Sequence, residues 1–313
     1  MHAIEVRELR KTYPGGTEAV KGIDFDVAAG EVFGLLGPNG AGKSTTIGML
    51  TTTVAPTSGS ARLGGYDVTR QPLRARGVSS VVFQEPVVDR SLSGRENIGL
   101  HARLWGVPAL AARRRTAELL EALRLSGLID RKVGSYSGGE RRRLEIARAL
   151  VSGPRVLFLD EPTVGLDPRV RYELLEVIAS LRAREELTIL VTTHYLEEAQ
   201  RLCDRVAIIH RGKIVALDSP GALLAGLGNE ILEFRVDGDA AAAVAVMRDC
   251  GVADGDAFSV GARVTVPLHG RAASGALAAV GASGLRVFEI QVRAPTLDDV
   301  YIHLTGRQIG NGG

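Results

Sequence analysis

Hydrophobic and polar positions alternate near the start of the chain. Between residues 23 and 27 three apolar side chains are separated by two aspartates, and a period of two is the pattern of a strand with one buried face. The next apolar run, residues 32–36, is continuous, as in a strand buried on both faces of a central sheet. A glycine-rich turn follows it, and the pattern then predicts a helix at about 43–50.

In the middle of the chain the hydrophobic pattern changes from that of strands to that of helices. From about residue 95 to 125 the pattern is helical and rich in Ala, Leu and Arg. Its arginine run, 113–115, is typical of a solvated helix face. Strand patterns then return at 155–160, 188–193 and 205–217. Helical patterns separate them, at about 169–184 and 196–203. The last strand pattern predicts a hairpin that turns near 211–212, and the alternation as a whole predicts an α/β fold.

After residue 228 the composition shifts to small residues. The predicted elements are a strand, a helix, two strands, a helix and a strand, at 231–236, 239–249, 257–260, 263–267, 271–282 and 285–292. This βαββαβ order fits a ferredoxin-like unit of about 80 residues.

Composition narrows the class of protein. The 313 residues suffice for one large domain and a small one. Lys and Arg total 38 against 36 Asp and Glu, a balance too even for general attraction to nucleic acid. Cys203 and Cys250 form no metal-binding pair motif and are expected to be ordinary thiols. No apolar run approaches the roughly 20 residues that span a bilayer, which predicts a soluble chain.

The strongest chemical signal is a GxxxxGK[ST] motif between a predicted strand and a predicted helix. It consists of Gly37, Pro38, Asn39, Gly40, Ala41, Gly42, Lys43 and Ser44. Glycines let main-chain N–H groups curl around phosphate oxygens, and the helix N-terminus adds partial positive charge. Lys43 then reaches the β- and γ-phosphates and the Ser44 hydroxyl is placed to ligate Mg²⁺. A chance glycine-rich turn would lack this strand–loop–helix context, so the motif predicts nucleoside triphosphate binding.

Two carboxylates end the apolar strand predicted at 155–160. Asp160 can hold Mg²⁺, and Glu161 can polarise an attacking water as a general base. Alone, an apolar strand that ends in acids is as often structural as functional. Together with the phosphate loop, the pair predicts hydrolysis of the bound nucleotide.

The segment 136–140, Tyr-Ser-Gly-Gly-Glu, lies shortly before the Asp160 strand. With the two motifs above it resembles the signature of ATP-binding-cassette (ABC) ATPases, in which Ser-Gly-Gly opens a helix and caps the γ-phosphate held by the opposite subunit. The resemblance implies this role for Ser137, Gly138 and Gly139, whose hydroxyl, bare N–H groups and helix dipole suit an anion. Tyr136 and Glu140 stand where the family usually has Leu and Gln. Elsewhere, Ser-Gly-Gly is usually a linker.

Further single residues match the family pattern in sequence order. Gln84 resembles the glutamine that contacts Mg²⁺ and the attacking water, and Asp167 resembles the aspartate of the loop that links the two sites of a dimer. His194 resembles the switch histidine that hydrogen-bonds the γ-phosphate. Tyr13 resembles the aromatic residue that stacks on adenine, and Thr45 continues the phosphate loop.

The resemblance covers residues 4 to about 220. It implies a P-loop ABC ATPase domain at 1–228, with a mixed central sheet, an antiparallel β lobe and a helical subdomain at about 85–153. Residues 229–313 would then form the small C-terminal α+β domain.

The resemblance also implies a function. The chain would hydrolyse ATP with Mg²⁺, as the motor subunit of an ABC transporter on the cytoplasmic face of the membrane. The implied metal ligands are Ser44, Gln84 and Asp160, and the implied catalytic groups are Lys43, Gln84, Glu161 and His194. Two copies would sandwich two ATP molecules and drive a separate integral membrane permease, which docks near Leu92, Glu96 and Asn97. The tail at 295–301 resembles that of daunorubicin-resistance-type exporters, so the implied cargo is a drug or other small hydrophobic compound.

Two alternatives stay open at this point. Non-transport ABC ATPases of translation or DNA repair generally carry two cassettes, a long coiled coil or zinc modules, and this sequence has one cassette without sustained heptads or Cys/His clusters. A regulatory subunit that binds ATP without turnover is the second alternative. The intact Lys43, Asp160, Glu161 and His194 argue against it.

Overall fold

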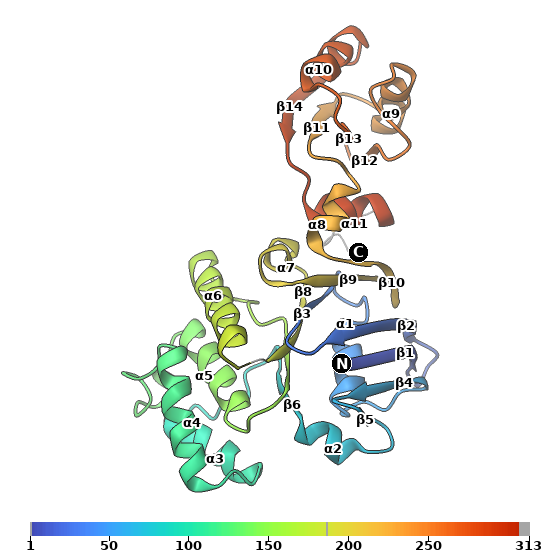
Figure 1. Cartoon of the computed structure of the whole chain (residues 1–313). Coiled ribbons are helices and arrows are strands. Elements are labelled where there is room, and N and C mark those ends of the chain that lie inside the picture. Colours follow the sequence, from blue (N-terminus) through green and yellow to red (C-terminus); the bar gives the residue numbers. More distant parts are fainter. Residues whose placement is uncertain (1, 186, 307–313) are drawn as a thin grey trace.

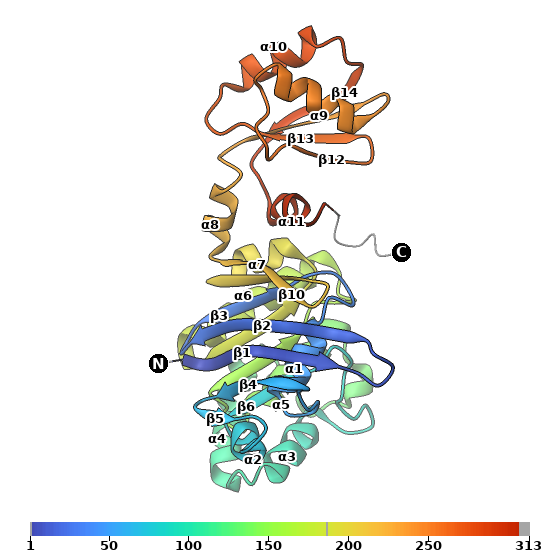
Figure 2. The same cartoon turned by 90° about the vertical axis from the view of Figure 1, so that its right-hand side faces the viewer.

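The computed structural model describes residues 2–185 and 187–306. A large α/β body contains two sheets, and a smaller sheet with its own helices lies at the opposite end of the molecule (Figure 1). Two short helices, α8 (Pro220–Ala225) and α11 (Leu297–Thr305), lie between these parts (Figures 1 and 2). No helix within the described ranges is both long enough and apolar enough to span a bilayer.

The central sheet of the body has six strands, of which five are parallel. Their spatial order is β10 (Lys213–Asp218), β9 (Arg205–His210), β3 (Val32–Leu36), β8 (Thr188–Thr193), β7 (Val156–Asp160) and β6 (Ser79–Val82). Only β10 runs antiparallel, as the second arm of the predicted hairpin with β9. Its turn residue Arg211 has a φ of 49° and Gly212 a φ of 82°, the left-handed conformation that a tight hairpin turn needs.

The second sheet of the body is antiparallel. Its strands lie in the order β2 (Glu18–Ala28), β1 (His2–Thr12), β4 (Ser58–Leu63) and β5 (Tyr66–Asp67). The α/β class, the mixed central sheet and the antiparallel lobe expected from the sequence are therefore all present.

Strand β3 explains how the central sheet is buried. Val32 and Leu36 contribute to one hydrophobic core, on the side of the helical layer. Phe33 and Leu35 contribute to a second core, shared with the antiparallel sheet and α1. Because successive side chains of a strand point to opposite faces, the continuous apolar run is what a sheet covered on both sides requires.

Helices occupy the rest of the body. They are α1 (Lys43–Leu50), α2 (Pro72–Gly77), α3 (Gly94–Leu104), α4 (Ala109–Ala122), α5 (Gly138–Leu150), α6 (Pro168–Glu185) and α7 (Leu196–Leu202). The helical pattern predicted at 95–125 is two helices, because Gly106 has a φ of 67° and Pro108 precedes the first turn of α4. Helices α3 to α6 lie together beside the central sheet (Figure 1).

The third sheet is antiparallel and lies in the C-terminal part of the chain. Its strand order is β12 (Phe258–Val260), β13 (Arg263–Pro267), β11 (Ile231–Val236) and β14 (Val287–Arg293). Helices α9 (Ala240–Asp249) and α10 (Ala273–Ala282) cover one face and share a separate hydrophobic core with it. These elements follow the predicted βαββαβ order, and the central position of the first and third strands is the ferredoxin-like arrangement.

Helix α11 returns to the large α/β body after the third sheet. Its Leu297, Val300 and Tyr301 belong to the core on the helical side of the central sheet. The Tyr301 hydroxyl lies 2.8 Å from Nδ1 of His210 at the end of β9. The tail is therefore packed against the body.

Helix α3 buries a histidine. The His101 side chain is 9% exposed, and its ring stacks on Trp105 with 4.3 Å between centroids. Its Nε2 has no hydrogen-bond partner among the described residues. Burial, and to a smaller extent the charge of Arg148, lowers the pKa of His101 to about 4, because a buried imidazolium loses hydration.

Acid is therefore expected to destabilise the helical layer. As the pH falls from about 6.5 to 4, the unfolded chain binds a proton at His101 that the folded chain does not, and the linked loss is on the order of 3 kcal/mol. The variant His101→Phe keeps the ring stack and cannot titrate, so its stability should fall less over this range. Urea unfolding at pH 7 and pH 5, followed by fluorescence of Trp105, the single tryptophan, measures the difference. Equal pH dependence in both proteins would contradict the prediction.

Candidate functional site

The phosphate loop, residues 37–42, connects β3 to α1. A Cβ atom at Gly37 would lie 2.2 Å from the carbonyl oxygen of Ile209 on β9, and one at Gly42 would lie 2.6 Å from that of Ala19 on β2. Gly42 also has a φ of 113°, which side chains disfavour. The glycines are therefore required by close packing of the loop against two strands, at the N-terminus of α1, where anions bind favourably.

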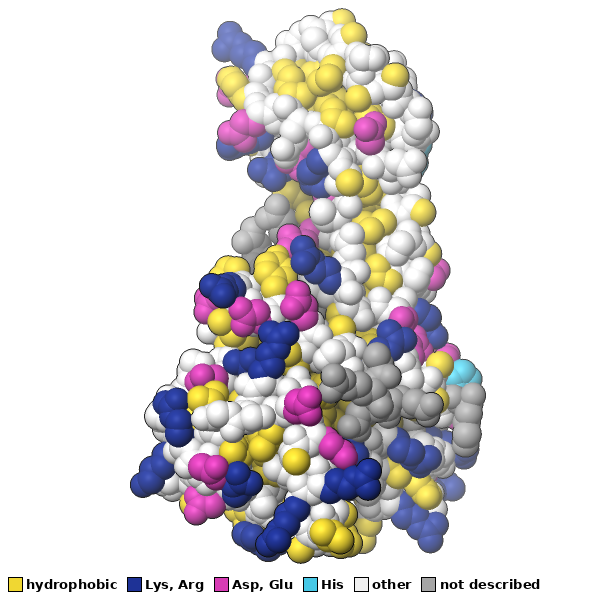
Figure 3. Space-filling view, turned by 60° about the vertical axis from the view of Figure 1, so that its left-hand side comes forward, with side chains coloured by type: hydrophobic (Ala, Val, Ile, Leu, Met, Phe, Trp, Pro, Cys, Tyr) yellow, Lys and Arg dark blue, Asp and Glu magenta, His cyan; other side chains and the backbone are white. Residues whose placement is uncertain are grey.

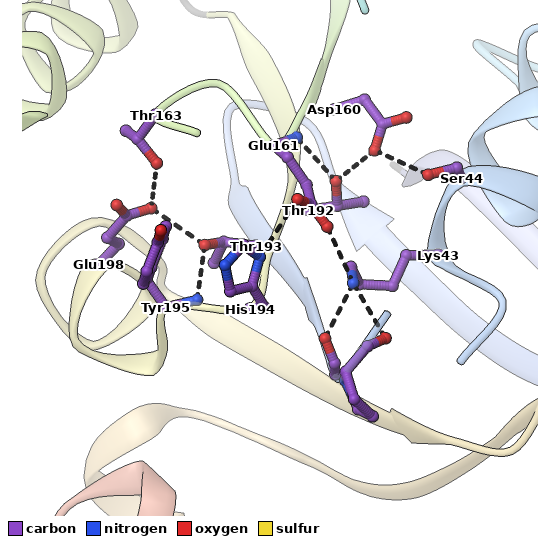
Figure 4. Close-up of polar contacts among 12 residues, drawn as sticks. Lys43, Ser44, Asp160, Glu161, Thr163, Thr192, Thr193, His194, Tyr195 and Glu198 are labelled. Atoms are coloured by element: carbon purple, nitrogen blue, oxygen red, sulfur yellow. Dashed lines mark hydrogen bonds and ion pairs between the residues drawn. The ribbon is translucent and has the colours of Figure 1, made fainter. Parts of the chain in front are cut away.

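Lys43 begins α1 and is 4% exposed. Its Nζ donates to the carbonyl oxygens of Gly37 and Pro38, at 2.9 and 3.2 Å. It also forms an ion pair of 3.0 Å with Oε1 of Glu161, whose side chain is 6% exposed. The loop therefore wraps around one buried ammonium group, and this group is already bonded to a carboxylate (Figure 4).

Asp160 ends strand β7. Its Oδ1 accepts from the Thr192 hydroxyl at 2.6 Å and from the Ser44 hydroxyl at 3.3 Å. This places one carboxylate and one hydroxyl oxygen beside the phosphate loop, and such hard oxygen donors suit Mg²⁺. The donor set of Ser44 and Asp160 thus fits the ion that the sequence implies.

Glu161 is held in an unusual conformation. Its φ of 46° lies in the left-handed region, which costs free energy for a residue other than glycine and is found preferentially at functional sites. Its N–H donates to the main-chain and side-chain oxygens of Thr192. Its Oε2 lies 3.1 Å from Nδ1 of His194, directly after β8. The two side chains contact each other (Figure 4).

A cavity of about 430 Å³ opens beside these groups. Its lining includes Tyr13, Asn39, Gly40, Gly42, Lys43, Ser44, Thr45, Gln84 and Glu161. Tyr13 is 37% exposed, and its hydroxyl lies 3.4 Å from Oγ1 of Thr45. Gln84 thus borders the same cavity as the loop, while Ala41 lies beneath it and accepts a hydrogen bond from the N–H of Gly212.

The signature residues lie outside this cavity. Ser137 caps α5, where its N–H donates to Oε2 of Glu140 at 2.7 Å and its Oγ accepts from the N–H of Glu140. Glu140 thus forms a capping box with Ser137. Ser137 and Gly138 are exposed and Gly139 is buried, so the helix N-terminus is presented to the surface.

Asp167 is also outside the cavity. Its Oδ1 accepts from the N–H of Val170 at 3.0 Å, so it caps the first turn of α6. The side chain is exposed. One copy of the chain therefore brings Lys43, Glu161 and His194 together, and leaves Asp167 and the signature on its surface.

Sequence reasoning missed Arg142, which lies on α5 and is 6% exposed. Its guanidinium donates to the carbonyl oxygens of Phe83, Asp160, Glu161 and Pro162, and it pairs with Glu145 at 2.9 Å. It joins the signature helix to the strand end that carries the two carboxylates. The spacing of Arg142 and Glu145, i and i+3 on one helix face, was the available signal.

Several known proteins are similar to this chain over most of its length. The family model described as "ABC transporter" matches residues 20–164. The chain is 42% identical to the daunorubicin/doxorubicin resistance ATP-binding protein of Streptomyces peucetius, over 97% of this chain and 92% of that protein. It is 40% identical to the Nod factor export ATP-binding protein I of Burkholderia orbicola, over 98% of each chain.

A solved structure shares the fold of the body. The cbiO1 protein of Clostridium perfringens, described as part of the ABC transporter complex cbiONQ, aligns with a TM-score of 0.67 at 30% identity. The alignment covers 72% of this chain and 91% of that chain. The chain belongs to the ATP-binding subunits of ABC transporters, and it is an ATP-hydrolysing motor subunit of that family.

Proposed function

We propose that this subunit drives a separate membrane permease that exports drugs or other small hydrophobic compounds. The observation that carries the ATPase part is that the two carboxylate oxygens of Glu161 contact Lys43 and His194, beside the cavity of the phosphate loop. Export is supported by two relatives that align with nearly the whole chain, a drug-resistance protein and an export protein.

The phosphate loop is proposed to bind the nucleotide and its metal. Lys43 and the main-chain N–H groups of the loop hold the phosphates, and Tyr13 at the rim stacks on adenine. Ser44 and Asp160 hold Mg²⁺, together with Gln84. When bound, the ion supplies positive charge that offsets the charge of the phosphate oxygens.

Glu161 is proposed to be the general base. Its carboxylate pairs with Lys43. The γ-phosphate offers Lys43 another anion, so the carboxylate is released to accept a proton from the attacking water. His194, already 3.1 Å from Glu161, holds the γ-phosphate and the carboxylate in one arrangement.

The chain is proposed to work as a homodimer. Ser137 and Gly138 are exposed at the start of α5, and Asp167 is exposed at the start of α6. Each would complete the nucleotide site of the opposite copy, so the same surface of both copies would pair in a closed, isologous dimer. ATP closes this dimer because it contacts both copies, and loss of phosphate removes the contact.

The permease is proposed to dock on the helical layer, from the cytoplasmic face of the membrane. A groove of about 1220 Å³ lies between α3 and α4, and its lining includes Gly99, Ala102, Val107 and Leu120. Leu104 and Leu110 beside it are 71% and 82% exposed. The face in Figure 3 carries interspersed charges of both signs, which supports a protein partner over nucleic acid.

Two units are proposed within the chain, 1–228 as the ATPase domain with a helical subdomain at about 85–153, and 229–313 as the C-terminal domain. The separate core of the third sheet supports this division. Helix α11 is part of the second range, but its apolar side chains pack with the first.

The variant Glu161→Gln tests the proposed base. It should bind ATP, hydrolyse it at least about 100-fold more slowly, and accumulate as an ATP-bound dimer. Phosphate release and light scattering measure both properties. Glu176→Gln, at an exposed position of α6, is the control and should match the wild type. Hydrolysis at the wild-type rate by Glu161→Gln would refute the assignment of the base.

The proposed transport function is tested by identifying the proteins that co-purify with the trapped variant. Glu161→Gln purified with Mg-ATP from detergent-solubilised native membranes should bring a multi-spanning protein in stoichiometric amount, identified by mass spectrometry. Recovery of ribosomes or nucleic acid, or of no membrane protein, would leave the ATPase assignment intact and overturn the proposed permease.

A further inference from the structure

Glu198, on the first turn of α7, contacts both chain segments that carry the proposed catalytic groups. It is 4% exposed. Its Oε2 accepts from the Thr163 hydroxyl at 2.9 Å and from the Thr193 hydroxyl at 3.0 Å. Thr163 lies two residues after Glu161, and Thr193 directly precedes His194. One carboxylate oxygen therefore joins the loop after β7 to the last residue of β8, directly before His194 (Figure 4).

The Thr193 hydroxyl holds the backbone around the histidine. While it donates to Glu198, it accepts from the N–H of Tyr195 at 2.9 Å. His194 lies between Thr193 and Tyr195, so the Thr193 hydroxyl restrains the main chain on both sides of the histidine. The orientation of that hydroxyl depends on the acceptor that takes its proton, which is Glu198.

Glu198 does not cap the N-terminus of its own helix in the usual way. It is the third residue of α7, where a glutamate commonly accepts from the N–H of the N-cap residue. Here the N-cap is Tyr195, and its N–H donates to Thr193 instead. Burial raises the pKa of Glu198. Burial of a carboxylate costs free energy, and Glu198 does not offset this cost by capping its helix. Its hydrogen bonds to Thr163 and Thr193 therefore indicate its role.

A third segment also reaches Glu198. Nε of Arg171 lies 3.4 Å from Oε1 of Glu198, and its guanidinium lies 3.8 Å from the centroid of the Tyr195 ring. Arg171 is on the first turn of α6, and its N–H donates to the carbonyl oxygen of Asp167. The exposed loop of Asp167 is thereby connected to the histidine loop through one carboxylate.

We infer that Glu198 is a positioning residue for ATP hydrolysis, which holds His194 in register with Glu161 by accepting hydrogen bonds from Thr163 and Thr193. Its side chain does not line the cavity beside the phosphate loop. The inference rests on the proposed roles of Glu161 and His194. ATP hydrolysis should therefore depend on the hydrogen-bond acceptor at position 198, whereas nucleotide binding at Lys43 should not.

Three variants separate this role from a merely structural one. Glu198→Ala removes the acceptor and should lower kcat by about 10- to 100-fold through misplacement of the reacting groups, with the KM for ATP and the affinity for ADP within about threefold of wild type. Glu198→Gln keeps an amide oxygen that can accept both hydroxyl groups, and should restore kcat to within about threefold. Glu197→Ala, at the exposed neighbouring position, should match the wild type.

The outcomes are distinguishable. A kcat near wild type in Glu198→Ala would overturn the inference, as would a glutamine variant as impaired as the alanine variant, or loss of ADP binding together with kcat. If the alanine variant does not fold, Thr193→Val decides: reduced kcat with unchanged ADP affinity supports the inference, and unchanged kcat overturns it. If Glu161→Gln hydrolyses ATP normally, the proposed base fails instead, whatever the Glu198 variants do.

Discussion

The structure depends first on the parallel register of three neighbouring strands. Leu36 at the end of β3 pairs with Thr193 of β8, and Asp160 at the end of β7 pairs with Thr192. Because parallel strands in register end at the same edge, the phosphate loop, the two carboxylates and the histidine emerge together. The continuous apolar strands, buried on both faces, hold this edge in place.

The second constraint is electrostatic. Lys43 and Glu161 are both almost fully buried, and an isolated charge there would be strongly disfavoured. Their ion pair, with two main-chain carbonyl groups around the ammonium, compensates each charge. Breaking such a pair without a new partner is costly. A phosphate anion is such a partner for Lys43, which makes exchange of partners a natural way to couple nucleotide binding to release of the proposed base.

Much of the site could be predicted from the sequence because its parts are local. Lys43, Asp160 and Glu161 each occupy a short segment in which a strand, a turn and a chemical group follow one another. Arg142 and Glu198 were missed because most of their partners come from distant segments, 59 residues away for Phe83 and 35 for Thr163. No periodicity reports such contacts.

The fold, too, was predictable where the sequence signal is local and not where it depends on contacts between distant segments. The βαββαβ elements were predictable from alternating patterns, whereas the helical pattern at 95–125 concealed a break at Gly106 and Pro108. The surface that the tail helix α11 covers was not predictable from the sequence. Tyr301 of α11 contacts His210, and such long-range packing is decided by the assembled body and not by local propensity.

In the proposed dimer, each nucleotide site is built from Lys43 of one copy and Ser137 of the other. Mixing the variants Lys43→Ala and Ser137→Ala tests it directly, because each alone lacks a complete site while their heterodimer has one. The mixture should regain ATP hydrolysis, up to about a quarter of the wild-type rate, because half of its dimers carry one complete site. A mixture no more active than the sum of its two inactive components would contradict it.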